Sequence, residues 1–312
     1  MKSRNKKTKI VLILIMIMLT TGCTQTLKDS NKKVVTNPET GQNITKNILC
    51  QPKNEKVIEK YEDNNIDINK LPKCEDYSVT SGGYEGLWTS LFVKPLAFVI
   101  LFITKYVKSA GLALIITSIG LRLILYPVTK KTAMQSELIK KAQPELDRLE
   151  KKYKDKTDTE SIMRKSNEMT MIYKKYNINP ISGCLYSFIQ LPLFFAFFEA
   201  INRVPLLFEE NFLKLQLGTT PYVGLINNGN WLYLLLIALV GLTTYYSFVL
   251  NSTMSQTENN PMKNMSNMMT VMIIVMGMFM PAALCIYWIA TNLFTIIQNL
   301  IVKRSKIVNG KA

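Results

Sequence analysis

The 312-residue chain contains no histidine. A serine–histidine–aspartate triad and a metal site with a histidine ligand are therefore excluded. The five cysteines are scattered, without a Cys-x-x-Cys pair, so a zinc site built from cysteines alone is not predicted. The phosphate-binding patterns GxxxxGK[ST] and GxGxxG are also absent. These absences argue against an enzyme and against a metal or cofactor, and favour a protein that binds or translocates other molecules.

Long apolar runs dominate what is present. Hydrophobic residues make up 48% of the chain, and they gather in stretches of about 20, the length of helix that spans a bilayer. The net charge is +16, but Lys and Arg flank the apolar runs or fill one loop, as they do in membrane proteins. Nucleic acid is the rival explanation of this charge, and a loop facing ribosomal RNA would satisfy both. We predict an all-α polytopic membrane protein.

Residues 1–22 resemble the signal peptide of a bacterial lipoprotein. Five Lys and Arg residues precede the ten-residue apolar core 10–19, and small residues lead to Cys23. The resemblance to a lipobox implies cleavage before Cys23 and attachment there of diacylglycerol and palmitate, although Thr20 stands where leucine is usual. A plain signal peptide or an uncleaved anchor is the alternative. Cleavage would leave residues 23–87 as a lipid-anchored extracytoplasmic tail.

That tail is rich in Asn, Lys, Asp and Thr and shows little periodicity. Such a composition predicts a loosely ordered segment. Cys50 and Cys74 lie within it, where the environment outside the cell permits a disulfide. Two separate thiols are the alternative.

The apolar runs predict five transmembrane helices, at 110–128, 183–201, 231–250, 267–281 and 282–302. Segment 92–107 is also apolar, but its short run from Pro95 suits an outer interfacial helix. Loop 129–180 carries 13 Lys and Arg residues, and it would lie outside if 92–107 crossed the membrane, against the positive-inside rule. We therefore predict that loop 129–180 and the basic tail 303–312 are cytoplasmic.

Loop 129–180 is predicted to form a cytoplasmic helical hairpin, with an apolar stripe at helical spacing along each half. The stripes are Met134, Leu138, Ala142, Leu146, Leu149 and Tyr153 in the first half, and Ile162, Met169, Ile172, Tyr173 and Tyr176 in the second. Residues 154–156 form the turn, and Thr157 with Glu160 fits a capping box at the start of the second helix. Pro144 should kink the first helix or mark its weak point.

Arg122 lies about eleven residues, or roughly 17 Å, into the predicted span 110–128. An Arg at mid-bilayer costs roughly 2.5–3.5 kcal/mol on insertion scales. Its side chain either snorkels to the inner headgroups or faces a wet cavity shared with polar residues of other spans. The candidates for that company are Gln190, Thr291, Asn292 and Gln298, with Trp288 beside them.

Four motifs occur together: IGLRLILYP at 119–127, QPEL at 143–146, NPISGCL followed by QLP at 179–192, and IYWIATNLF at 286–294. In combination they resemble the YidC/Oxa/Alb family of membrane insertases, over about residues 88–302. The lipobox is similar to that of the Gram-positive lipoprotein form. Tyr186 departs from the pattern, because many relatives carry proline there, and this puts the local helix geometry in doubt.

The resemblance implies a hydrophilic groove within the membrane, open to the cytoplasm and to lipid but closed outside, with Arg122, Gln190 and Trp288 facing the substrate. Thr291 and Asn292, polar residues beside Trp288, are expected to line the same groove. The resemblance also implies a membrane protein insertase and chaperone that acts alone or with the Sec translocon. Its partners would be nascent membrane-protein clients, the ribosome through rRNA or ribosomal proteins, and membrane lipid. It implies no small-molecule substrate, and the basic hairpin would receive the client or its ribosome.

Two other classes compete with this interpretation. A small-molecule membrane transporter would show paired repeats or broken helices at mid-membrane, and neither pattern is found. A surface lipoprotein receptor would need a large folded outer domain, for which the polar tail is too short.

Overall fold

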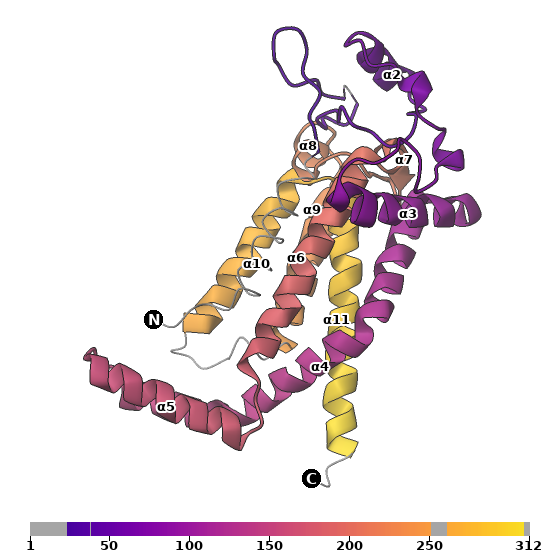
Figure 1. The fold of residues 1–312 in the computed structure, drawn as a ribbon. Helices are drawn as coiled ribbons and strands as arrows, with labels where there is room; N and C mark the ends of the chain where they lie inside the picture. Colours follow the sequence, from indigo (N-terminus) through magenta and orange to yellow (C-terminus); the bar gives the residue numbers. More distant parts are fainter. Residues whose placement is uncertain (1–23, 38, 251–260, 309–312) are drawn as a thin grey trace. The chain divides into compact units, whose positions relative to one another are not determined.

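The computed structural model describes residues 24–37, 39–250 and 261–308, with side chains at all of these except 180–189, 261–266 and 305–308. The predicted signal segment, Cys23 and the end of the basic tail lie outside the described residues. The described chain is mostly helical, as predicted (Figure 1). It divides into two compact units. Unit 1 takes in the chain up to Ser118, Pro192–Ile237 and Gly277–Tyr287; unit 2 comprises Ile119–Leu191, Ala238–Met276 and the chain from Trp288 onwards.

The α-helices are α2 (Glu55–Glu62), α3 (Lys94–Val107), α4 (Ala110–Lys152), α5 (Thr159–Lys175), α6 (Pro180–Arg203), α7 (Pro205–Glu209), α8 (Pro221–Ile226), α9 (Leu232–Leu250), α10 (Pro261–Phe279) and α11 (Ala282–Val308). Two 3-10 turns, η1 (Ile68–Lys70) and η2 (Cys74–Asp76), precede a π-helical turn, η3 (Thr89–Val93). Strands β1 (Asn211–Phe212) and β2 (Leu215–Gln216) form a short antiparallel pair.

Four of the described helical segments are long and apolar enough to cross a membrane: Thr89–Val107, Ala110–Lys152, Leu232–Leu250 and Ala282–Arg304. A shorter apolar helix covers Asn267–Phe279. Two of the four contain the spans predicted at 110–128 and 282–302, and Leu232–Leu250 matches the span predicted at 231–250 to within one residue. Helix α6 covers the span predicted at 183–201. Because 89–107 also has sufficient length, length alone does not separate an interfacial helix from a span. The total of five spans stays a prediction.

The first predicted span and the first half of the hairpin are one helix. The predicted span ends at 128, but α4 is a single helix of 43 residues that runs to Lys152 and contains Pro127 and Pro144. The residues that follow Thr129 are mostly Lys, Ala, Gln, Glu and Leu, which favour helix, and no glycine ends it there. A change from apolar to charged composition therefore marks a change of environment in this chain and not the end of a helix.

Proline does end a helix at Pro281, as predicted. Helix α10 ends at Phe279 and α11 begins at Ala282. The first N–H groups of a helix have no partner within it. Here the loop after α7 supplies partners, because Ala282 N–H donates to Thr219 O (3.0 Å) and Ala283 N–H to Leu217 O (2.9 Å).

The tail is ordered, and the prediction of a loose segment was wrong. Its apolar side chains form a buried cluster of Leu27, Ile44, Ile48, Val57, Tyr61 and Ile68. The Tyr61 hydroxyl donates to Thr45 O (2.7 Å) beneath this cluster. Cys50 and Cys74 form a disulfide, which decides between the two alternatives left open by the sequence. The polar composition concealed a small core whose members are far apart in the sequence.

Four charged side chains attach the segment that leads into α3 to the end of α6; three are buried, and the Glu85 side chain is 31% exposed. We call Glu85, Lys94, Glu199 and Arg203 the charge cluster. Arg203 is 1% exposed; it donates to Glu199 Oε1 (3.0 Å), pairs with Glu85, and donates from Nε to Asn47 O (2.6 Å). Lys94 pairs with Glu85 Oε1 (3.0 Å). Two cations and two anions balance, as buried charges require.

Backbone contacts complete the attachment of the tail to the end of α6. Leu49 N–H donates to Arg203 O (2.8 Å). The Glu209 carboxylate accepts the N–H groups of Lys53 (3.0 Å) and Asn54 (3.1 Å). Burial raises the pKa of this carboxyl, and the two backbone donors oppose the shift. The tail is thus held by residues more than 150 positions away in the sequence.

Helix α3 lies crosswise to the first turns of α4 (Figure 1). The chain turns between them at Lys108, which has a positive φ of 58°. Glu210 accepts the N–H of Ala110 at 2.8 Å and so caps the start of α4. A Cβ at Gly111 would lie 2.3 Å from the Phe212 ring, so only glycine permits this approach.

Candidate functional site

Unit 2 has a polar interior. Each of its helices α4, α9, α10 and α11 contributes polar side chains that are almost fully buried. These are Arg122, Thr129, Thr132, Ser136, Thr243, Thr244, Ser247, Thr270, Thr291, Thr295 and Gln298. Small polar residues are common where helices pack closely in lipid, but a buried arginine among them is not. This collection is the candidate site.

Arg122 is the only one of these residues with a permanent charge. It is 4% exposed, and its NH2 group donates to Gln190 Oε1 on α6 at 2.7 Å. The amide oxygen of Gln190 holds the guanidinium in place but brings no opposing charge. Because the Arg122 side chain is buried and bonded to α6, it does not fit the snorkelling alternative, in which it would extend to the headgroups.

Two further hydrogen bonds join other helices around the same interior. Asn292 Nδ2 on α11 donates to Thr244 Oγ1 on α9 (2.9 Å). Thr129 Oγ1 on α4 bonds Gln298 Oε1 on α11 (3.1 Å). Polar contacts thus connect α4 with α6, α4 with α11, and α9 with α11.

The two remaining predicted site residues lie one turn of α11 apart. Thr291 is 1% exposed, and its hydroxyl donates to Trp288 O (3.0 Å). Trp288 is half-buried. All five residues predicted to line the groove belong to unit 2. Their contact with a substrate stays a prediction.

Most hydroxyl groups in this interior donate to a carbonyl of their own helix. Thr132 donates to Thr129 O (2.7 Å), Ser247 to Thr244 O (2.8 Å) and Thr295 to Thr291 O (2.9 Å). A hydroxyl has one donor and two accepting lone pairs, so a hydroxyl bonded in this way still offers acceptors. The interior therefore combines one cationic donor with many accepting oxygens.

Apart from Thr291, sequence reasoning missed the threonine and serine residues. Their signal is spacing: Thr129, Thr132 and Ser136 recur at intervals of three and four, as do Thr291 and Thr295 with Gln298 further along α11. This period places polar side chains on one face of an apolar helix.

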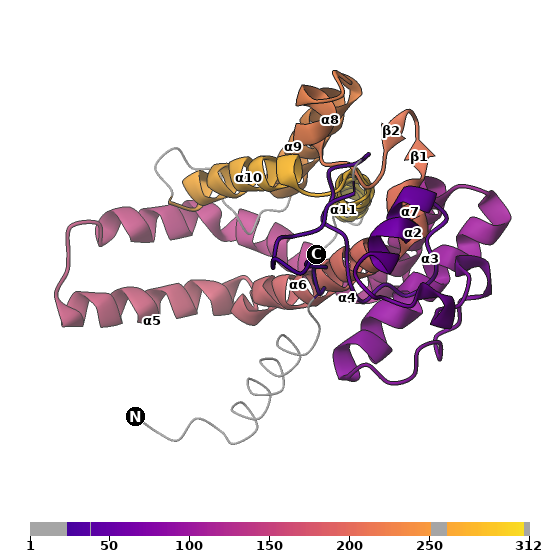
Figure 2. The same ribbon diagram turned by 90° about the horizontal axis from the view of Figure 1, so that it is seen from above.

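Helices α4 and α5 form the predicted basic hairpin, with α5 antiparallel beside the end of α4 (Figure 2). Glu145 of α4 accepts from Lys175 Nζ (2.5 Å) and from the Tyr176 hydroxyl (2.8 Å). Glu168 of α5 makes the equivalent contacts with Lys152 at the end of α4 and with Tyr153, the residue after it. The hydrogen bond from Lys175 is the main cause that holds the pKa of the Glu145 carboxyl below its ordinary value.

Two details of the hairpin differ from prediction. Asp158, not Thr157, caps α5, because its carboxylate accepts Ser161 N–H at 2.8 Å and the helix begins one residue later than expected. Ile162 was assigned to the inner stripe but is 57% exposed.

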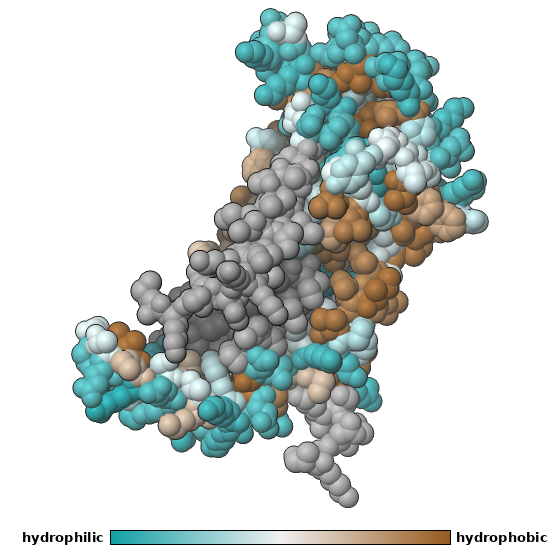
Figure 3. Space-filling model, viewed as in Figure 1, coloured by the Kyte–Doolittle hydropathy of each residue, from teal (hydrophilic) through white to brown (hydrophobic). Residues whose placement is uncertain are grey.

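The hairpin surface is largely hydrophilic (Figure 3). Apolar side chains interrupt it at Ile162, Met163 and Met171, which are all exposed. With 13 basic residues against 8 acidic ones in 129–180, the hairpin offers a positive surface with a few apolar contacts.

Comparison with known proteins places this arrangement in a family. The family model described as 60Kd inner membrane protein matches residues 102–309, two thirds of the chain. The chain belongs to the YidC/Oxa/Alb family. The region matched to this family contains the whole polar interior and both hairpin helices, and it begins within α3. The tail and the first half of α3 precede it.

Relatives from several bacteria extend the comparison. The protein named membrane protein insertase YidC of Alkalihalophilus pseudofirmus is 36% identical over 218 residues, which cover 69% of this chain and 81% of that protein. The membrane protein insertase YidC of Oceanobacillus iheyensis is 32% identical, over 70% of this chain and 85% of that protein. Membrane protein insertase YidC 2 of Bacillus anthracis is 31% identical, over 73% of this chain and 85% of that protein.

This chain shares its fold with a solved structure described as an active YidC insertase with the first transmembrane domain resolved. The TM-score is 0.51 at 24% identity, over 79% of this chain. This chain spans about half of that one, at 53%.

Proposed function

We propose that the chain inserts integral membrane proteins into the bilayer and assists their folding. The observation that carries this proposal is family membership, since relatives at least 31% identical over most of their length bear the name membrane protein insertase. The polar interior of unit 2 offers a physical route for the activity.

In this proposal the polar interior is the hydrophilic groove through which a client's polar outer segment passes. An Asp at mid-bilayer costs roughly 2.5–3.5 kcal/mol. Arg122 attracts that carboxylate; at 4 Å and an effective dielectric constant of about 20, the attraction is about 4 kcal/mol. The attraction therefore offsets the cost. Gln190, Trp288, Thr291 and Asn292 line the same path.

The client's apolar segment then moves into lipid. Burial of a helix of about 20 apolar residues supplies the driving force, at roughly 25 cal/mol per Å². Nucleotide hydrolysis is not required, because the client itself carries the free energy of insertion. The protein lowers the barrier for the polar segment and catalyses no covalent step.

The placement in the cell follows the same proposal. The N-terminus is lipid-anchored at Cys23 on the outer face, and the C-terminus and the hairpin are cytoplasmic. The positive surface of the hairpin, with its exposed Met163 and Met171, receives a client or the ribosome that makes it. The Sec translocon is a second partner for clients with larger outer segments.

The test compares Arg122→Ala with Arg122→Lys in cells depleted of the native protein. The client is a single-span protein with acidic residues in a short outer segment, and its matched form has those residues changed to Asn and Gln. We expect Arg122→Ala to reduce insertion of the acidic client at least tenfold and Arg122→Lys to retain most of it, because only the charge is needed. Insertion of the neutral client should change little.

Arg304→Ala is the control, because Arg304 is an exposed arginine of the same unit that lies outside both the polar interior and the hairpin. Immunoblots of membranes must show equal amounts of each variant. Equal activity of the Ala and Lys variants, or a loss that ignores the client's charge, would contradict the proposed role of Arg122.

A further inference from the structure

The turn between strands β1 and β2 in unit 1 has an unusual sequence. Phe212 pairs with Leu215, so the turn consists of Leu213 and Lys214. Both residues have a positive φ, of 52° and 65°. A tight hairpin turn needs this left-handed conformation at both positions, and Asn and Gly are preferred there. In other residues the Cβ atom comes too close to the following carbonyl oxygen, so a leucine at this position needs a reason.

Packing within the chain does not supply that reason. The Leu213 side chain is 74% exposed, the highest value among the large hydrophobic residues that the structure describes. The Lys214 side chain is exposed as well. Backbone strain that contributes nothing to a core is a signal of function, and here it points to a contact outside the chain.

The rest of the hairpin is fixed to the first turns of two long helices. The Phe212 ring lies against Gly111 at the start of α4. At the start of α9, Asn230 Nδ2 donates to Lys214 O (3.0 Å), and the Tyr233 hydroxyl donates to a carbonyl of β2 (3.1 Å). Because α4 and α9 are both long and apolar enough to cross a membrane, the turn lies at the membrane face where both of them begin.

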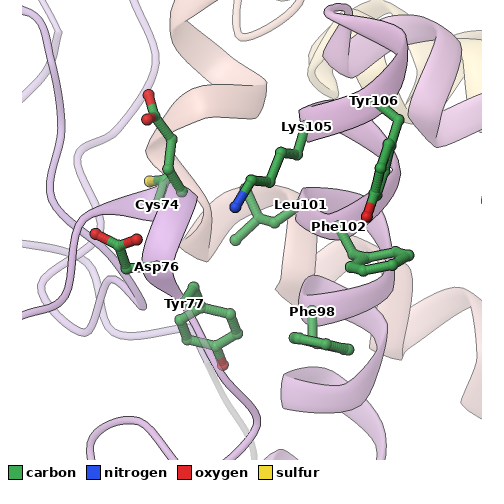
Figure 4. Close-up of a pocket in the computed structure, with 9 residues that line it drawn as sticks. Cys74, Asp76, Tyr77, Phe98, Leu101, Phe102, Lys105 and Tyr106 are labelled. Atoms are coloured by element: carbon green, nitrogen blue, oxygen red, sulfur yellow. The ribbon is translucent and has the colours of Figure 1, made fainter.

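Exposed aromatic residues mark the same boundary. Trp231 directly precedes α9 and is 66% exposed. Helix α3 leads into α4 and carries a row of rings, in which the centroid of Phe102 lies 5.9 Å from Phe98 and 5.1 Å from Tyr106 (Figure 4). Trp and Tyr gather where acyl chains meet headgroups. Both α9 and α4 are thus preceded by residues typical of the membrane interface.

We propose that Leu213 and Lys214 anchor the hairpin in the outer leaflet of the bilayer. The leucine side chain lies among the acyl chains, and the lysine ammonium reaches the phosphates on its flexible stem. A stable protein partner would need a much larger surface than one exposed turn. The anchor holds the first turns of α4 and α9 at a fixed depth. The placement of α4 and α9 in a membrane is the premise, and insertase activity is not.

The experiment measures the depth of the turn with spin labels on the full-length protein in liposomes of dioleoyl phosphatidylethanolamine and phosphatidylglycerol. Leu213→Cys, Ile116→Cys and Val34→Cys are labelled separately, in a chain whose Cys184 and Cys285 are changed to serine. Ile116 is 40% exposed within the candidate span and gives the value for lipid; Val34 is 44% exposed in the tail and gives the value for water.

Collisions with oxygen, which concentrates among acyl chains, are compared with collisions with a nickel chelate, which stays in water. We expect the ratio at Leu213 to be roughly fivefold above that at Val34, and close to that at Ile116, because the side chain lies below the headgroups. A ratio equal to that at Val34 would place the turn in water and overturn the proposal. Low collision rates with both reagents would show that protein covers the turn, which overturns it as well.

The variant Leu213→Asn separates the side chain from the turn. Asn adopts the left-handed conformation more readily than leucine, so the hairpin keeps its shape. With the label moved to Lys214→Cys, the ratio should fall about threefold in Leu213→Asn, because the tip withdraws towards water. Val34→Asn is the matched control and should leave the ratio at 214 unchanged.

An unchanged ratio in Leu213→Asn would refute the anchoring role of the leucine. Because no client is present, a failure here leaves the proposed insertase function standing.

Discussion

Arg203 is the residue whose loss should most disturb unit 1, through the charge cluster. Its guanidinium is 1% exposed and Glu199 beside it is 3% exposed. The substitution Arg203→Met removes one cation and leaves Glu85 and Glu199 with only Lys94 to balance them. Removing one partner of a buried ion pair costs roughly 3–5 kcal/mol, because the other charge stays buried without compensation.

Hydrogen exchange at the Leu49 amide measures this cost. That N–H donates to Arg203 O, so it is exposed only when the tail opens away from the end of α6. A loss of 3–5 kcal/mol corresponds to an opening constant larger by about two to four orders of magnitude. The amide should therefore exchange at least a hundredfold faster in Arg203→Met than in the wild type.

Two comparisons separate charge from packing. Adding Glu199→Gln to Arg203→Met restores neutrality, since Lys94 and Glu85 still pair, and should recover much of the lost protection. Lys56→Met breaks an ion pair with Glu39 whose members are 64% and 48% exposed, and should cost less than about 1 kcal/mol. If Arg203→Met exchanges within threefold of the wild type, or if the double variant is worse than the single one, the reasoning is refuted.

Three further changes test the fold. Cys74→Ser removes the bond to Cys50 and should destabilise the tail by about 2–4 kcal/mol, measured by exchange of tail amides. Gly224→Ala puts a methyl group 2.2 Å from the Tyr233 ring and should cost about 1–3 kcal/mol, measured as a lower thermal unfolding temperature. The Glu145 carboxyl has a lowered pKa, so its contribution is complete above the ordinary value near ~4.3 and disappears as the pH falls through the lower folded value. Spin labels on α4 and α5 should therefore move apart in acid and not at neutral pH.

Each of these changes has a matched control. Cys285→Ser alters a buried free cysteine and should leave the tail amides protected. Gly120→Ala meets nothing within 4 Å and should be neutral or stabilising; a larger loss there than at Gly224 would speak against the steric argument. Glu145→Gln should reduce the acid response of the hairpin, and a response of unchanged size would show that other groups control it.

The apolar spans could be predicted because their signal is local. Twenty consecutive apolar residues or a single proline need no distant partner, and the limits of α9 and the break at Pro281 agree with the expectations to within a residue or two. The ordered tail could not be predicted. Its apolar residues follow no period, and its attachment depends on Arg203 and Glu209, whose partners Asn47 and Lys53 are each 156 residues away.

The candidate site also combines residues that could be predicted from the sequence with contacts that could not. Arg122, Gln190 and Asn292 are conspicuous within apolar runs, so the sequence could nominate them. Their surroundings were less accessible, because a threonine such as Thr244 is an ordinary residue of a membrane helix. Which of several threonines accepts from Asn292 depends on how the helices pack, and the sequence alone does not specify that.

The distance along the chain between the tail and its attachment site has a consequence for synthesis. Residues 24–87 emerge long before Arg203 and Glu209 exist. At about 5–20 residues per second, the 156 intervening residues take roughly 8 to 30 s to make. The two cysteines are only 24 residues apart, so the disulfide and the small apolar core can form within this interval. The tail can therefore fold before the end of α6 is made and attach to it afterwards.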